Sequence, residues 1–132
     1  MINNIYAKTM NFKIDTREKF TIITPVSDLS SDNLTAELKE LIKSYLQHKT
    51  NLVINLKNVA KAEENFINDL AAWQSAFYEQ NISFVVCEVQ TVVEAVIEEL
   101  ELDDTMNITP SETEAWDIVQ MEEIERELLG DE

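Results

Sequence analysis

Residues 52–89, LVINLKNVAKAEENFINDLAAWQSAFYEQNISFVVCEV, decide the fold class of this chain. Two short apolar runs, Leu52–Leu56 and Ser83–Val89, lie on either side of a segment with helical periodicity. The apolar positions of that segment recur at spacings of four, three and four residues: Phe66, Leu70, Trp73 and Phe77. The helix is expected to end at Asn81, a residue type that tolerates the left-handed conformation. Because neither run alternates with polar residues, the pattern predicts adjacent, parallel strands that are buried on both faces.

The residues before this unit predict a hairpin followed by a helix. Asn11–Ile14 and Phe20–Thr24 have the composition of strands, and the polar segment DTREK separates them. An amphipathic helix follows, with an apolar stripe between Leu34 and Leu46. Its N-cap candidates are Ser30, Ser31, Asp32 and Asn33.

The residues after this unit predict a helix, a short strand and a final helix. Thr91 and Glu94 have the spacing of a capping box, and Ser111 and Glu114 repeat it. A short strand, Met106–Thr109, lies between the two helices, and the final helix is expected at about 111–129, with Gly130 beyond its end. The complete order predicts one α/β domain over residues 1–132, built on a mixed, mostly parallel sheet of four to five strands with about four helices.

Several kinds of site are excluded by missing residue types. Gly130 is the only glycine, so no loop can be a P-loop or a dinucleotide fingerprint, which need glycines where the backbone meets phosphate. His48 is the only histidine and has no cysteine or histidine cluster around it, which argues against a metal site and against catalysis. Cys87 is the only cysteine, which favours the reducing cytoplasm and an inert buried thiol. We expect no cofactor.

Charge is distributed unevenly along the chain. Residues 1–61 hold nine of the ten basic residues and six acids, whereas residues 62–132 hold Arg126 and twenty acids. The two segments therefore carry net charges of +3 and −19, within a total of −16. Such a chain repels nucleic acid and anionic membranes. The acidity is either a solvated face or a docking surface for a basic partner.

The order of elements and the sequence INLKNV, residues 54–59, resemble the STAS domain family of anti-sigma factor antagonists, whose equivalent strand ends in a pattern like LDLSGV. The resemblance covers about residues 10–120 and is densest over residues 52–91; NITPSETEAW, residues 107–116, resembles the family's last strand and the capped start of its last helix. It implies a mixed sheet with helices packed mainly on one side. It also implies regulation by partner switching, in which a kinase that is also an anti-sigma factor phosphorylates a serine in a D-S-S-G motif.

The match without gaps aligns D-S-S-G with Glu63, Glu64, Asn65 and Phe66, so the serine that would accept phosphate corresponds to Asn65. None of the four residues is kept. Two interpretations remain open. The glutamates could act as a partial mimic of a phosphorylated loop, because each carries about one negative charge where a phosphate carries nearly two. Alternatively the switch has decayed, and Asn65 only caps the helix.

The sequence thus predicts a cytoplasmic, non-catalytic regulatory module that binds a protein partner. By resemblance this partner is an anti-sigma factor or a kinase-like protein, and the charge suggests that its surface is basic. The candidate contact residues are Glu63, Glu64, Asn65, Asp69 and Glu94. A second acidic candidate surface is the last helix, with Glu122, Glu123, Glu125 and Glu127. The alternatives are a small-ligand-binding STAS module and a structural homodimer.

Overall fold

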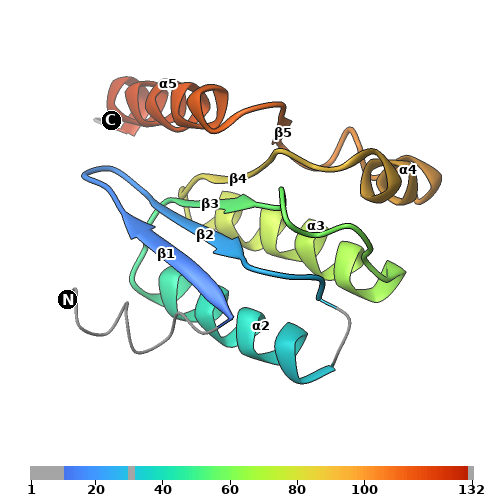
Figure 1. Cartoon of the computed structure of the whole chain (residues 1–132). Helices are drawn as coiled ribbons and strands as arrows, with labels where there is room; N and C mark the ends of the chain where they lie inside the picture. The colour runs from blue at the N-terminus through green and yellow to red at the C-terminus, as the bar shows by residue number, and fades with distance from the viewer. Residues whose placement is uncertain (1–10, 30–31, 131–132) are drawn as a thin grey trace.

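The structure, a computed structural model, describes residues 11–29 and 32–130 and forms a five-stranded sheet with helices on both faces (Figure 1). Four helices lie in this part of the chain. The elements in chain order are β1 Phe12–Thr16, β2 Thr21–Pro25, α2 Asp32–Gln47, β3 Leu52–Asn55, α3 Glu64–Glu79, β4 Phe84–Cys87, α4 Thr91–Glu99, β5 Ile108–Thr109 and α5 Glu112–Gly130.

The strands lie in the sheet in the order of the sequence, β1 to β5. β1 and β2 form the antiparallel hairpin, and all other neighbouring strands are parallel. β3 pairs directly with β4, with Leu52 opposite Phe84 and Ile54 opposite Val86. Every residue of these two strands is buried. The prediction of two adjacent, parallel and buried strands is therefore confirmed.

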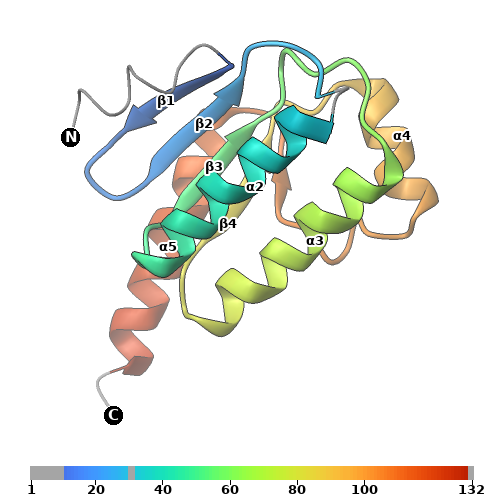
Figure 2. The ribbon, with the colours of Figure 1, turned by 90° about the horizontal axis from the view of Figure 1, so that it is seen from below.

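α2 and α3 cover one face of the sheet and α5 covers the other, while α4 lies beside α3 (Figures 1 and 2). α2, α3 and α4 pack on the face that carries Ile23, Ile54 and Val86. α5 packs Ala115 and Val119 against the opposite face. Each right-handed crossover moves one strand further in the same direction, which places the three crossover helices on one side. No described strand follows α5, so this rule does not constrain it.

Three helices end in a left-handed residue that is not glycine. Asn81, which has φ 62°, follows α3 as predicted. The amides of Asn81 and Ile82 donate to the carbonyls of Tyr78 and Phe77, both at 3.0 Å, which is a Schellman motif. Lys49 after α2 and Glu101 after α4 have φ values of 55° and 58° and take the same role, although neither is a residue type that favours it.

Of the two predicted capping boxes, only the one at Ser111 forms a capping hydrogen bond. The amide of Glu114 donates to the Ser111 hydroxyl over 3.2 Å, and that hydroxyl donates to the Glu114 carboxylate over 2.9 Å. The prediction of a capping box at Thr91 was wrong, because the N-cap of α4 is Gln90 and Thr91 is already helical. Helical backbone at Thr91 turns its hydroxyl away from the free amides.

Other ends also differ from the prediction. Gly130 is the last residue of α5 and not the left-handed residue beyond it. β4 ends at Cys87 because Glu88 has φ 55°, which breaks the extended backbone. The N-cap candidates Ser30 and Ser31 lie outside the described residues.

Candidate functional site

The predicted switch loop lies between β3 and α3, at the carboxyl ends of the parallel strands. This edge of an open α/β sheet is where ligands and partners commonly bind, because the connections from several strands converge there. The segment after β2 lies on one side of the loop, and the segment after β4 lies on the other. The loop therefore occupies the middle of the edge.

Polar contacts fix the loop to both of its neighbours. On the β2 side, the Asp28 carboxylate accepts hydrogen bonds from the amides of Ala60 and Lys61, the second over 3.3 Å. On the β4 side, Gln90 donates from Nε2 to the carbonyl of Lys57 over 2.7 Å. Within the loop, Asn55 Oδ1 accepts from the Lys57 amide over 2.9 Å. The loop is thus a defined platform for the start of α3.

The four residues aligned with D-S-S-G span the first turn of α3. Glu63 is the N-cap residue, with extended backbone at φ −79° and ψ 157°, and its side chain makes no capping hydrogen bond. Glu64 and Asn65 are the first two helical residues and are exposed. Phe66 is only 5% exposed and packs in the core.

The prediction that Asn65 caps α3 was therefore wrong. A capping side chain must stand outside the helix on extended backbone, and Asn65 is already helical. The buried Phe66 anchors the first turn and determines where the helix begins. Asn65 instead presents its amide to solvent, at the place where the resemblance puts a phosphate acceptor.

The structure groups four of the five candidate contact residues closely. Glu63, Glu64 and Asn65 are contiguous and exposed, and Asp69 lies one helical turn further on. The Asp69 carboxylate pairs with Lys39 of α2 at 3.3 Å, so it is less free to meet a partner. Glu94 is exposed in the first turn of the neighbouring helix α4, which begins at the same edge of the sheet.

The edge is less acidic than the whole chain suggested. Exposed Lys57 and Lys61 lie in the same loop as Glu63 and Glu64, so the segment 57–65 carries no net charge. Exposed apolar side chains also lie along this edge, Val26 after β2 and Val92 in the first turn of α4. The sequence does not reveal the exposure of either valine, because isolated apolar residues next to buried runs give no signal of exposure. The resulting surface mixes charged, amide and apolar groups, as protein interfaces do.

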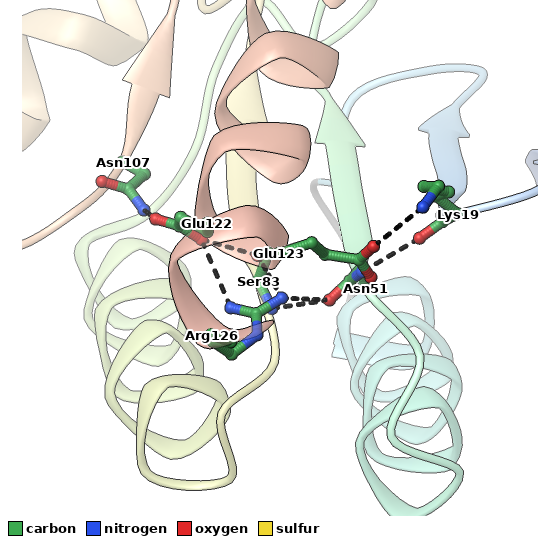
Figure 3. A network of polar contacts seen from close by, with 7 residues as sticks. All are labelled: Lys19, Asn51, Ser83, Asn107, Glu122, Glu123 and Arg126. Atoms are coloured by element: carbon green, nitrogen blue, oxygen red, sulfur yellow. Dashed lines mark hydrogen bonds and ion pairs between the residues drawn. The ribbon is translucent and has the colours of Figure 1, made fainter. Parts of the chain in front are cut away.

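The four glutamates of the last helix do not form one surface. Glu122 accepts a hydrogen bond from the Ser83 hydroxyl over 2.6 Å, and Glu123 accepts one from Asn51 Nδ2 over 2.6 Å (Figure 3). Both side chains therefore fasten α5 to the amino ends of β3 and β4, at the opposite end of the sheet from the switch loop. Glu125 and Glu127 are exposed.

The described residues offer few reactive groups at or near the candidate site. Among the described residues, no group of three or more His, Cys, Asp or Glu could hold a metal ion. Burial raises the pKa of the Cys87 thiol to about 12, with the Glu112 charge adding to the effect, so the thiol stays protonated and unreactive. Within residues 11–29 and 32–130, no helix combines the length and apolar character needed to cross a membrane.

Comparison with known proteins identifies the fold. No family model and no curated protein matches the sequence. Solved structures do match. A Thermotoga maritima protein assigned as an anti-sigma factor antagonist superposes with a TM-score of 0.74 at 16% identity, over 83% of this chain and 94% of its own. The fold is the STAS fold.

Two further STAS structures agree with this assignment. An RsbS variant from Moorella thermoacetica has a TM-score of 0.64 at 16% identity, over 81% of this chain and 95% of its own. A STAS domain protein from Planctomyces limnophilus has a TM-score of 0.58 at 17% identity, over 79% of this chain and 93% of its own. The STAS resemblance predicted from the sequence is thus confirmed at the level of the fold.

Proposed function

We propose that this chain is a single STAS domain that acts as a cytoplasmic, non-catalytic regulatory module. It binds a protein partner through the edge formed by the switch loop, the start of α3 and the start of α4. The observation that carries the proposal is the position of Asn65. It is exposed in the first turn of α3, on a loop held by Asp28 and Gln90, where the family resemblance puts the phosphate acceptor.

The proposed module is not switched by phosphorylation at this site. A side-chain amide cannot take a phosphoryl group from ATP as a hydroxyl can. Glu63 and Glu64 precede Asn65 and place two carboxylates near the positive end of the α3 dipole. Lys57 and Lys61 balance these charges within the loop, which weakens the interpretation as a permanent phosphate mimic and favours a decayed switch.

Phosphorylation assays test the state of the loop. Incubation with serine kinases of the partner-switching type should leave residues 58–70 unmodified. The Asn65→Ser variant of the same protein should become labelled, because the backbone around residue 65 already presents an exposed side chain. Because residues 58–70 of the unaltered protein hold no serine, threonine or tyrosine, the informative outcome is labelling of the variant at residue 65. Failure to label the variant would show that the kinase does not recognise this platform.

Charge reversal tests the partner-binding edge. Affinity purification from the native source, followed by mass spectrometry, supplies the partner. Glu63→Lys combined with Glu64→Lys should weaken its binding, and rising salt should weaken the unaltered complex mainly through a slower on-rate. The matched control is Glu79→Lys combined with Glu99→Lys, at exposed positions near the other ends of α3 and α4. Equal losses from both pairs would contradict a localised site.

One observation favours the small-ligand alternative. A groove of about 1140 Å³ lies between the β1–β2 hairpin and α2. Its apolar lining includes Ile14, Phe20, Leu41 and Tyr45, and its charged lining combines three basic residues, Arg17, Lys19 and Lys49, with four acidic ones, Glu18, Glu37, Glu40 and Glu123. Native mass spectrometry of the purified chain should reveal a copurified small ligand if this groove is a binding site. Leu41→Trp, which fills the groove, should then remove that ligand.

A further inference from the structure

α5 is apolar on two opposite faces. Ala115 and Val119 are fully buried against the sheet. On the opposite side Met121, Ile124 and Leu128 are 59%, 56% and 73% exposed. Their spacings of three and four residues place them in one line along the helix, because a helical residue turns the chain by about 100°. We call these three residues the outer stripe.

The orientation of α5 is fixed, so the outer stripe cannot turn inward. Three side chains of α5 form hydrogen bonds with Asn51 or Ser83: Glu122, Glu123 and Arg126 (Figure 3). Arg126 Nη2 lies 3.2 Å from the Ser83 hydroxyl and 3.4 Å from Asn51 Oδ1. Rotating the helix would break these contacts and leave the buried side chains of Asn51 and Ser83 without these partners, which is costly. Exposure of the stripe is therefore a stable property of the fold.

The outer stripe has the spacing of a coiled-coil seam. With Met121 and Leu128 at a positions and Ile124 at d, Glu125 takes an e position and Glu127 a g position. Residues at e and g flank the seam and determine which helix can pair with it. Both flanks are acidic here, and both side chains are exposed.

This charge pattern favours one kind of helix over another as the binding partner of the outer stripe. In a homodimer through the stripe, glutamates of one copy would face glutamates of the other, between chains of net charge −16 each. Like charges across a helical seam destabilise pairing. A helix with Lys or Arg at its own e and g positions would instead place opposite charges on both sides of the apolar contact.

We propose that the outer stripe of α5 docks an amphipathic helix with basic flanks, supplied by a different protein. The stripe is a second interaction surface, separate from the switch-loop edge. The start of α5 lies at the carboxyl end of β3, where Glu112 accepts a hydrogen bond from Asn55. The second half of α5 lies at the amino end of the same strand, where Glu123 accepts a hydrogen bond from Asn51. The two surfaces thus lie at opposite ends of the sheet and can be occupied together. The proposal does not depend on the function of the switch loop.

A designed peptide tests this proposal on the full chain. The probe is a labelled amphipathic helix with Leu at a and d and Lys at e and g. The control peptide has Glu at e and g instead. Fluorescence anisotropy should show salt-sensitive binding of the Lys peptide and no binding of the Glu peptide.

Substitutions that preserve charge separate docking from general attraction to an acidic protein. Ile124→Gln combined with Leu128→Gln should weaken binding of the Lys peptide by about tenfold or more, equivalent to about 1.4 kcal/mol. The control is Val92→Gln, since Val92 is a similarly exposed apolar residue at the other end of the sheet. It should leave binding unchanged. Urea unfolding should confirm that all variants are folded.

Two results would overturn the proposal. Equal binding by the unaltered protein and the double glutamine variant would mean that the peptide senses only net charge. Sedimentation of the protein as a dimer that Ile124→Gln dissociates would assign the stripe to self-association.

Discussion

Asn55 at the end of β3 joins the start of the switch loop to the start of α5. Its Nδ2 donates to Oε2 of Glu112 over 2.7 Å, and its Oδ1 accepts from the Lys57 amide over 2.9 Å. The side chain is fully buried. One amide therefore controls the geometry at both the loop and the helix on the far face of the sheet.

Asn55→Ala should lower the free energy of unfolding by about 1–3 kcal/mol, because it leaves the partners of a buried amide unsatisfied. Glu112→Gln is the matched control, since the glutamine side chain keeps an oxygen that can accept the Asn55 hydrogen bond. Urea denaturation measures both. Comparable losses in the two variants would indicate that the negative charge of Glu112, and not the hydrogen bond, is what matters.

The two sequence motifs that resemble capping boxes should respond differently to alanine. Ser111→Ala removes a cap that forms and should cost about 0.5–2 kcal/mol of stability. Thr91→Ala removes a hydroxyl that caps nothing at the start of α4 and should cost little, because alanine is the better helix former. Thermal unfolding of the two variants measures both losses of stability. A larger loss at Thr91 would contradict the helix start at that residue.

Lys49→Gly should stabilise the protein by about 0.5–1 kcal/mol. Lys49 has φ 55°, a conformation that costs a residue with a Cβ about 1–2 kcal/mol, and glycine adopts it freely at an entropic cost of about 0.5–1 kcal/mol. The matched control is Lys43→Gly in the interior of α2, at an exposed position. It should destabilise by about 1 kcal/mol. Opposite signs for two identical substitutions are the expected result in urea denaturation, and the same sign for both would contradict the left-handed end of α2.

Stability should fall as pH rises above about 9, in part through Cys87. Burial raises the pKa of this thiol to about 12 in the folded protein, whereas an unfolded thiol ionises near its usual pKa of about 8.5. Between these values the unfolded chain has released a proton that the folded chain keeps, which favours unfolding. Denaturation measured from pH 7 to 10.5 should show a shallower decline for Cys87→Ala than for the unaltered protein.

A thiol reagent provides a second readout for the same residue. In the folded protein at pH 8, Cys87 should react slowly, and it should react rapidly once urea has unfolded the chain. Rapid labelling of the folded protein would show that the thiol is accessible and its pKa is not raised.

The fold was predictable because its signals are local. The apolar runs of β3 and β4, and the periodic stripes of α2 and α3, each lie within a few residues of the chain, and their order admits few topologies. The location of the candidate site followed in the same way, since it is the junction between two such elements. The family resemblance aligned Asn65 with the phosphate acceptor, and this assignment stays a prediction.

The helix ends were predicted less well, because several residues compete for each end. Asn65 and Thr91 have side chains that can cap, yet each lies inside its helix in the structure. The burial of Phe66 and Val93 decides where the first turn begins, and that burial depends on the packing of α3 and α4 against the sheet. Local capping preference is worth about 1 kcal/mol, less than burying a large apolar side chain.

The sequence by itself determined the order of strands and helices and the two buried central strands. The tertiary structure alone decided which acids are free. Glu123 is bound to Asn51, 72 residues away, and Glu122 to Ser83, 39 residues away, whereas Glu125 and Glu127 face solvent beside the outer stripe. The physical reason is range: apolar periodicity acts along a few turns of chain, but the partner of a polar side chain is chosen by whatever distant residue the packed sheet brings within hydrogen-bonding distance.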